Sequence, residues 1–432
     1  MKLLLKSNFL FTPSFDEVSI FEDSYLFVEN GIVVSLSKTR PEIDAEFIDY
    51  SDKIIIPGFI DSHLHAPQFC NVGLGYDMQL LPWLNKYTFP EEQKFEDLSY
   101  AFRVYSKLID TMIRNGTTRS VLFASLHRQA SSLLMRMLEF AKVGGFVGKV
   151  SMDRNSPDFY IETQEEAKQE LESFVRSCYN GPNALVNPIL TPRFVPTCTP
   201  ELLSFIGKLS DEFNLPIQSH ADENLNEIKW VAALHPESAS YVGVYNDYGC
   251  LNNRTVLAHV VHPSEHGMEL MKQTGAFVAH CPSSNCNLAS GMAPIKKLVS
   301  NGINVSLGSD ISGGHDLSMS KVMTLAVQIS KMRAVEDGCP DDILDAFNAL
   351  YLATKAGGAL FGKVGSFEPG YEFDALVIDD SSLTDVNERT IAERAQRFIY
   401  CGDDRCIFER YVRGERVELP DWNKFSFGVA EK

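Results

Sequence analysis

The alternation of short apolar strands with amphipathic helices across the middle of the chain most constrains its fold. This alternation is typical of an α/β architecture with parallel strands. The predicted strands are Ile54–His65, Thr118–Phe123, Phe146–Met152, Leu185–Thr191, Ile217–His220, Val256–His259, Phe277–His280 and Val305–Asp310. Eight strands separated by helices are the number found in a (β/α)8 barrel. We therefore predict an α/β protein whose main domain is a TIM-like barrel.

Helix signals between the strands agree with this prediction. Thr199 is a favourable N-cap, and Pro200 after it suits the first helical position. Thr163–Cys178 and Ser320–Arg333 are amphipathic runs of helical length. The interval Ala66–Glu91 is rich in glycine and aromatic residues and shows no helical period, so we expect a functional loop or lid over the mouth of the barrel.

Both ends of the chain have the pattern of short strands and turns. Asn30-Gly31 between apolar runs predicts a β-hairpin. The predicted strands are Lys2–Leu5, Tyr25–Val28, Ile32–Leu36, Asp374–Ile378, Arg397–Cys401 and Cys406–Val412. We therefore predict a small β-sandwich domain built from residues 1–56 and 365–432, around a barrel with trailing helices over residues 57–364.

Metal-ligating side chains stand at the predicted strand ends. His63 and His65 are two positions apart on a strand, so their side chains point to the same face and can bind one cation. His220 and His259 end the fifth and sixth strands, and Asp310 ends the eighth. Because (β/α)8 enzymes carry their chemistry at the carboxyl ends of the strands, this arrangement favours a metal site over histidines that merely fill the core.

Composition limits the classes of function. The formal net charge of −18 argues against non-specific binding to nucleic acid or anionic membrane. Lys6 interrupts the first apolar run too early for a signal peptide, and no apolar stretch approaches about 20 residues. The 9 cysteines are scattered without a Cys-x-x-Cys pair, which is typical of reduced thiols and excludes a zinc ribbon. We expect a cytoplasmic protein that binds neither membrane nor nucleic acid.

The order of these motifs resembles the amidohydrolase superfamily of metal-dependent hydrolases. His-x-His on the first strand, His on the fifth and sixth and Asp on the eighth carry the resemblance, together with the border Pro57–His63. Within that superfamily the chain is similar to the guanine deaminase family. The segments that carry this closer resemblance are His63–Gln68, Leu81–Pro90, Pro192–Phe194 and Ser219–Asn224.

The resemblance implies a site for one zinc ion per chain. It assigns His63, His65, His220 and Asp310 as the metal ligands. Two-metal members of the superfamily use a lysine on the fourth strand, and Leu185–Thr191 contains none, so a single ion is indicated. The ligands would also accept Fe²⁺.

The resemblance also implies the reaction, which is hydrolysis of guanine to xanthine and ammonia in purine catabolism. Glu223 is expected to carry protons between the attacking water, the ring and the leaving amine, while His259 and Asp310 orient the water. The expected substrate is a small purine base and the expected assembly a homodimer. Gln68, Trp83, Arg193 and Phe194 are the predicted substrate-binding residues.

Two alternatives stay open from the sequence. The chain could be another mononuclear amidohydrolase that acts on a different purine or a triazine-like heterocycle, or a non-catalytic scaffold with this fold. The presence of the complete set of predicted ligands and of Glu223 disfavours the scaffold. The roles of His262, His280 and His315 are not determined by their patterns.

Overall fold

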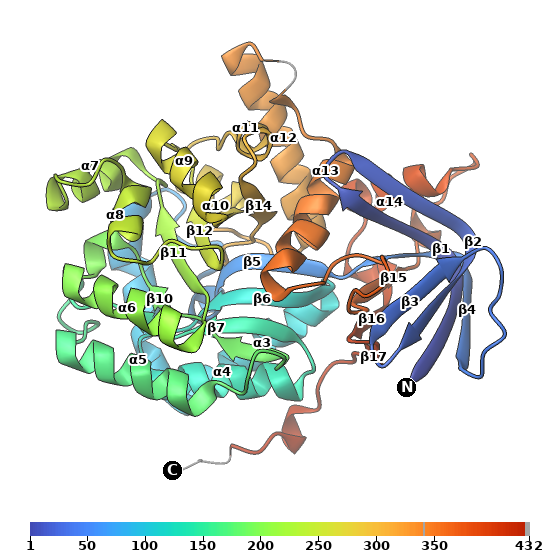
Figure 1. The fold of residues 1–432 in the computed structure, drawn as a ribbon, viewed down its shortest axis with the longest axis horizontal. Helices are drawn as coiled ribbons and strands as arrows, with labels where there is room; N and C mark the ends of the chain where they lie inside the picture. The colour runs from blue at the N-terminus through green and yellow to red at the C-terminus, as the bar shows by residue number, and fades with distance from the viewer. Residues whose placement is uncertain (340–341, 428–432) are drawn as a thin grey trace.

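The parallel strands of the middle of the chain close into a barrel, shown in Figure 1 for the computed structural model, which describes residues 1–339 and 342–427. Its strands are β5 (Phe59–His65), β6 (Thr117–Phe123), β7 (Gly144–Gly148), β8 (Val150–Ser151), β9 (Val186–Pro188), β10 (Thr191–Pro192), β11 (Ile217–Ala221), β12 (Thr255–His259), β13 (Phe277–His280) and β14 (Asn304–Leu307). They pair in parallel in the orders β5-β6-β7-β9, β8-β10 and β11-β12-β13-β14. This is the predicted barrel, with the third and fourth strands each interrupted once.

Backbone hydrogen bonds close the ring between its first and last strands. The amide of Asp310 donates to the carbonyl of His63 at 2.8 Å, and the amide of His65 donates to Ile311 at 2.8 Å. Gly308 permits this approach, because a Cβ built there would lie 2.8 Å from the Cβ of His63. On the opposite side, Leu190, which lies between β9 and β10, forms a bridge with Ile217 of β11. The closure brings Asp310 beside the histidines of β5.

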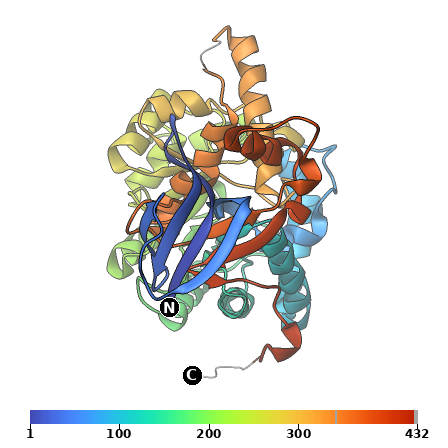
Figure 2. The ribbon, with the colours of Figure 1, turned by 90° about the vertical axis from the view of Figure 1, so that its right-hand side faces the viewer.

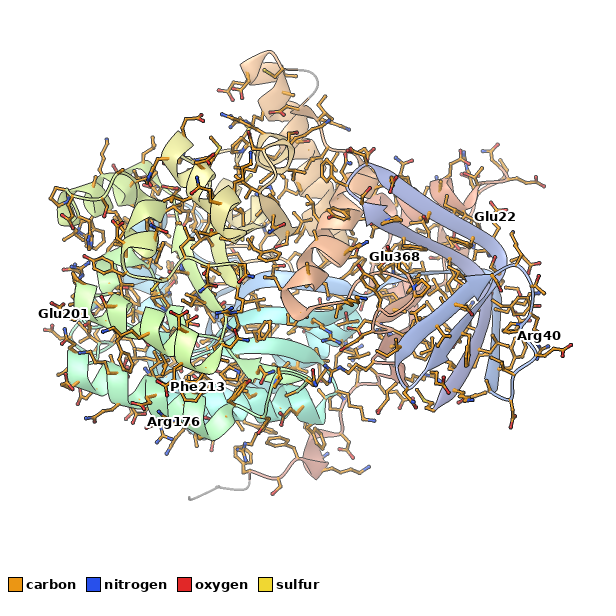
Figure 3. The ribbon with its side chains drawn as sticks, viewed as in Figure 1. Glu22, Arg40, Arg176, Glu201, Phe213 and Glu368 are labelled. Atoms are coloured by element: carbon orange, nitrogen blue, oxygen red, sulfur yellow. The ribbon has the colours of Figure 1, made fainter. Side chains whose placement is uncertain are left out.

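Helices cover the outside of the barrel. They are α3 (Leu98–Arg114), α4 (Arg128–Phe140), α5 (Gln164–Cys178), α6 (Pro200–Phe213), α7 (Leu225–Leu234), α8 (Tyr241–Asp247), α9 (Glu265–Thr274), α10 (Pro282–Asn287), α11 (Ile295–Ser300), α12 (Met319–Asp337) and α13 (Ala346–Tyr351). The predicted cap of α6 is confirmed, since the Thr199 side chain accepts a hydrogen bond from the amide of Leu202. In Figure 3, Arg176 of α5 lies near Phe213 of α6, with its guanidinium 4.9 Å from the ring centre.

Strands from both ends of the chain form one seven-stranded sheet. It lies to the right of the barrel in Figure 1, and in Figure 2 it faces the viewer, with blue strands from the beginning of the chain next to red strands from its end. Its strands are β1 (Lys2–Ser14), β2 (Glu17–Glu29), β3 (Ile32–Ser37), β4 (Glu46–Pro57), β15 (Ala375–Ile378), β16 (Ile407–Val412) and β17 (Glu415–Arg416), in the order β17-β16-β15-β4-β1-β2-β3. Phe9, Phe367 and Phe373 lie in a core of its own. The joining of the two chain ends agrees with the sequence prediction, while a sandwich of two sheets and the exact domain bounds stay predictions.

A buried ion pair joins this sheet to the barrel. Arg119 on β6 donates from Nε to Asp374 Oδ2 at 2.6 Å, just before β15, and also pairs with Glu372. Arg119 and Asp374 are 2% and 1% exposed. Burial of two charges is tolerated when they neutralise each other, so this contact fixes the position of the small sheet against the barrel.

Three predictions about elements were wrong in detail. Arg397–Cys401 is part of helix α14 (Ile391–Cys401), where Thr390 and Glu393 form a capping box and apolar residues recur with helical spacing. The predicted strand Ile54–His65 belongs to two sheets, because β4 ends at Pro57 and β5 begins at Phe59. The predicted loop Ala66–Glu91 contains short helical segments, which are η1 (Ala66–Asn71), α1 (Leu80–Trp83), η2 (Leu84–Thr88) and α2 (Phe89–Glu92).

None of the helices in the described part of the chain is long and apolar enough to span a membrane.

Candidate metal centre and substrate pocket

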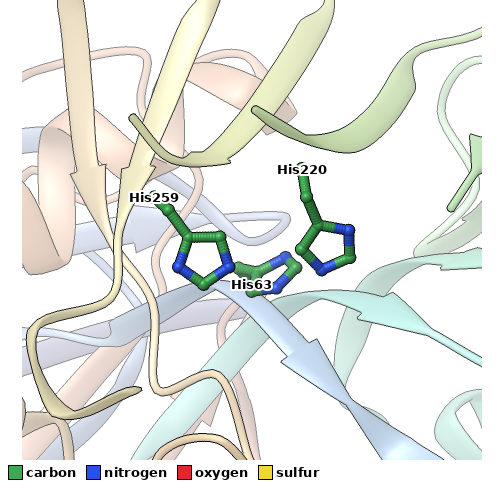
Figure 4. Close-up of side chains that lie close together, drawn as sticks. All are labelled: His63, His220 and His259. Carbon is green, nitrogen blue, oxygen red and sulfur yellow. The ribbon is translucent and has the colours of Figure 1, made fainter. Parts of the chain in front are cut away.

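The predicted metal ligands meet at the carboxyl end of the barrel. Figure 4 shows His63, His220 and His259 facing one point from three strands. These three imidazoles, and separately His63, His65 and Asp310, have ligand atoms within 4.8 Å of one another. All five side chains are buried, with His220 the most exposed at 9%. The structure therefore brings together residues that lie far apart in the sequence.

The nitrogen and oxygen atoms of this cluster are placed as metal ligands would be. His63 Nε2 and His65 Nε2 lie 3.2 Å and 3.5 Å from Asp310 Oδ1. His65 Nε2 lies 3.0 Å from His220 Nε2. The geometry of the contact between His63 Nε2 and Asp310 leaves this buried nitrogen without a hydrogen bond among the described residues. A buried polar atom without a hydrogen bond costs free energy. A cation at this point would bind His63 Nε2 together with the neighbouring ring nitrogens and Asp310 Oδ1.

Hydrogen bonding outside the cluster fixes the His220 ring. Its Nδ1 donates to the carbonyl oxygen of Arg193 at 2.5 Å, which leaves the Nε2 lone pair directed into the cluster. Burial lowers the pKa of His63, and it lowers the pKa values of His65 and His220 well below the ordinary range, so these rings are neutral. Neutral imidazole is the form that binds a metal ion.

Asp310 and His259 are the two remaining members of the cluster, and their pKa values shift in opposite directions. Burial opposes ionisation of Asp310, but the imidazoles of His63 and His259 hold its pKa below the usual range. Burial also opposes the charging of His259, but Glu223 and Asp310 beside it raise its pKa. His259 Nε2 lies 3.5 Å from Glu223 Oε2 and 3.8 Å from Asp310 Oδ2. His259 is therefore suited to hydrogen bonding between two carboxylates, whereas the neutral histidines are suited to metal ligation.

Backbone conformation at these positions is unusual. His259 and Asp310 have φ angles of +74° and +48°, and neither is glycine. Left-handed backbone at such residues costs free energy and is concentrated at functional sites. The strained positions here aim the two side chains at the cluster.

Glu223 lies at the edge of the cluster and faces the pocket. Burial raises its pKa to about 7, and Ser290 donates to its Oε1 at 3.1 Å. Glu227, also buried, accepts from the backbone amides of Glu223 and Asn224 at 3.1 and 3.2 Å and so fixes this turn. A carboxyl group that titrates near neutral pH can both accept and donate a proton.

A pocket opens beside the cluster. Its walls include all four predicted substrate-binding residues, Gln68, Trp83, Arg193 and Phe194, together with Glu223. Apolar side chains, among them Trp83 and Phe194, and convergent polar and charged side chains both line it, which is the combination that small-molecule sites use.

One residue of this region was missed by the sequence analysis. Glu92, at the end of α2, is 0% exposed and accepts hydrogen bonds from both Arg193 and Gln68. It follows directly after the segment Leu81–Pro90 that carried the resemblance, but nothing in its local pattern distinguishes it from its neighbour Glu91. Only the fold shows which of the two carboxylates faces Arg193 and Gln68.

A family model for the amidohydrolase family matches residues 54–417. The chain belongs to the amidohydrolase family. Guanine deaminase from Dictyostelium discoideum is 42% identical over 381 residues, which cover 86% of this chain and 84% of that protein. Guanine deaminase from Mus musculus is 37% identical over 382 residues, which cover 84% of this chain and 83% of that protein.

A solved structure resembles this amidohydrolase over nearly its whole length. It is guanine deaminase from C. acetobutylicum with guanine bound in the active site, which has a TM-score of 0.94 and 46% identity. The alignment covers 97% of this chain and 100% of that chain. The agreement confirms the barrel and the family predicted from the sequence.

Three further histidines of this amidohydrolase take places outside the metal cluster. His280, at the end of β13, is 1% exposed, and burial lowers its pKa to about 3. His262 Nε2 donates to the carbonyl oxygen of Ser290 at 2.7 Å, and His315 Nδ1 lies 2.9 Å from Ser283 Oγ. His262 therefore fixes the loop that carries Ser290, the hydrogen-bond donor to Glu223.

Proposed function

We propose that this protein catalyses the hydrolytic deamination of guanine to xanthine and ammonia. The observation that carries the proposal is the burial of a His and Asp donor set and of Glu223 beside a pocket that Gln68 and Arg193 line, at one end of the barrel. Guanine deaminases at 37% to 42% identity over most of the chain support the same reaction. A non-catalytic scaffold would not need the donor set and the proton carrier together.

The metal is proposed to be one Zn²⁺ per chain, held by His63, His65, His220 and Asp310. Three neutral imidazoles and a carboxylate suit zinc, and β9 (Val186–Pro188) and β10 (Thr191–Pro192) offer no lysine for a second ion. Bound zinc supplies acidity, because it lowers the pKa of water from 15.7 to about 7.

Glu223 is proposed to carry the protons of the reaction. Its carboxylate takes a proton from the attacking water and gives it to N3 of guanine, and it then carries a second proton to the amine that leaves C2. The water supplies oxygen to C2 and ammonia departs, so guanine and water give xanthine and ammonia. His259 and Asp310, 3.8 Å apart, are proposed to orient the water for attack. A pKa near 7 suits Glu223 to both proton transfers.

Recognition of the base is proposed to use both polar and flat groups of the pocket. Arg193 donates to the O6 oxygen of guanine, while Gln68 can both donate to and accept from a ring edge. Trp83 and Phe194 provide apolar walls, 3% and 5% exposed. The Trp83 indole Nε1 donates to the carbonyl of Leu74 at 3.1 Å, which holds the ring in place.

The test is to incubate purified protein of known metal content with guanine and to measure xanthine and ammonia. Adenine, cytosine and guanosine serve as parallel substrates. We expect equal amounts of xanthine and ammonia from guanine, no product from the other three, and one zinc per chain. Bound metal with unchanged guanine would contradict the substrate and favour another mononuclear amidohydrolase reaction. Cytoplasmic location and a homodimer stay predictions.

A further inference from the structure

We propose that Glu92 is a positioning residue that holds Arg193 and Gln68 in the orientation that selects a purine with an oxo group at C6. The inference rests on the proposed function, because it assigns Arg193 to the O6 edge of the base. Glu92 itself is not among the residues that line the pocket, so it acts through these two side chains.

One carboxylate binds both recognition residues. Arg193 donates from Nη1 to Glu92 Oε2 at 2.8 Å and from Nη2 to Oε1 at 3.1 Å, a bidentate pair. Gln68 donates from Nε2 to Glu92 Oε1 at 2.8 Å. Because bidentate pairing fixes the plane of a guanidinium group, Glu92 sets the direction in which the remaining N–H donors of Arg193 point.

Burial makes this contact costly to lose. Glu92, Gln68 and Arg193 are 0%, 1% and 2% exposed. Among the described residues, Glu92 is the one carboxylate within ion-pair distance of Arg193. Without its charge the guanidinium would be buried and uncompensated, and it would turn toward any other acceptor within reach.

The arrangement also fixes the orientation of the Gln68 amide. An ionised carboxylate only accepts hydrogen bonds, so the Gln68 NH₂ group must face Glu92. Its Oε1 is then directed elsewhere, toward the backbone amide of Ser312 at 3.5 Å. Glu92 thereby decides which edge of Gln68 is available as an acceptor.

The fixed donors discriminate between purines. A guanidinium group has donors and no acceptor, so it binds an oxo oxygen at C6 and leaves the hydrogens of a C6 amine unmatched. A site whose buried donors lose their partner rejects the mismatched ligand strongly. Glu92 therefore contributes to the preference for guanine over a 6-aminopurine, although it does not touch the base.

The test compares two ligands that differ at C6, hypoxanthine with its oxo group and unsubstituted purine. Calorimetric titration of the metal-loaded protein gives both affinities. We expect Glu92→Gln to weaken hypoxanthine binding by roughly 10- to 100-fold, the range for a hydrogen bond to a charged group. Purine binding should change by less than about threefold, because it makes no O6 contact.

Glu91→Gln is a matched control, since the substitution and helix are the same. Glu91 is also buried, at 6% exposed, but it pairs with Lys94 at 2.6 Å and with Tyr100, away from Arg193. Both affinities should stay at the wild-type value in this variant. Glu92→Asp keeps the charge and should recover part of the hypoxanthine affinity.

The double variant Arg193→Met with Glu92→Gln keeps the test decisive if Glu92→Gln alone does not fold, because it leaves no buried guanidinium. It should bind hypoxanthine as weakly as Arg193→Met alone. The positioning role would be overturned by an equal loss of affinity for both ligands in Glu92→Gln. It would also be overturned if the losses of hypoxanthine affinity in the two single variants added up in the double variant. Wild-type protein that leaves guanine unchanged would instead contradict the proposed function.

Discussion

At the scale of single residues, Glu223 tests whether proton transfer is separate from metal binding. Its Oε2 faces His259, and it belongs to none of the groups of converging metal ligands. Glu223→Gln should therefore lower kcat for guanine by about 10²- to 10⁴-fold, because an amide cannot carry the proton. Metal analysis of the same preparation should give the wild-type zinc content. Glu237→Gln, at a side chain 65% exposed, is the control that should change neither quantity. A variant that loses zinc together with activity would make Glu223 a ligand.

The residues of the site differ in how far the sequence could predict them. His63, His65, His220, His259 and Asp310 were predictable because parallel strands place their carboxyl ends at one edge, so the position on a strand fixes the place in space. Glu92 was not predictable, because its partner Arg193 is 101 positions away and the turn of a short helix decides which of two buried carboxylates faces Arg193. Patterns with period two or 3.6 carry no information about such a contact.

At the scale of elements, Arg119 tests how the small sheet is attached to the barrel. It pairs with Asp374 at 2.6 Å, and both are buried between β6 and β15. Arg119→Met should lower the free energy of unfolding by about 3–5 kcal/mol, because it leaves a buried carboxylate without its partner. Urea unfolding, monitored by circular dichroism, measures this free energy of unfolding.

Arg405→Met is the control for Arg119→Met, since Arg405 also pairs with an aspartate at 2.6 Å but its side chain is 85% exposed. Its stability should stay close to that of the wild type, because water screens exposed pairs. Equal stability of the two variants would show that the buried pair does not hold the sheet to the barrel.

Elements with strong local signals were predicted well, and the others were not. The helix that Thr199 opens was predictable from its cap, which acts within four residues. Arg397–Cys401 taken alone has the apolar run of a short strand, and the capping box at Thr390 that makes it the end of helix α14 lies seven positions before it. The segment Leu84–Thr88 forms a π-helical turn, a geometry with no sequence period of its own.

At the scale of the whole molecule, the candidate metal centre joins strands from distant parts of the chain. Its proposed ligands come from β5, from β11 and from the turn after β14, so the unfolded chain holds no preformed site. An ion that binds the folded protein alone stabilises it by about 4.1 kcal/mol when its free concentration is 1,000 times Kd. We therefore expect the Tm of metal-depleted protein to be lower than that of the loaded protein, and to rise with added zinc as activity returns.

His220→Asn tests whether this response comes from the proposed site. The variant keeps a polar side chain but removes the imidazole whose Nδ1 is fixed by Arg193, so its Tm should not respond to zinc. Differential scanning calorimetry over a series of free zinc concentrations distinguishes the cases. A wild-type Tm that is unchanged by complete removal of the metal would mean that the barrel closes without help from the ion. The buried imidazoles would then have to be accommodated by hydrogen bonds to one another and to Asp310, and the centre would contribute to catalysis alone.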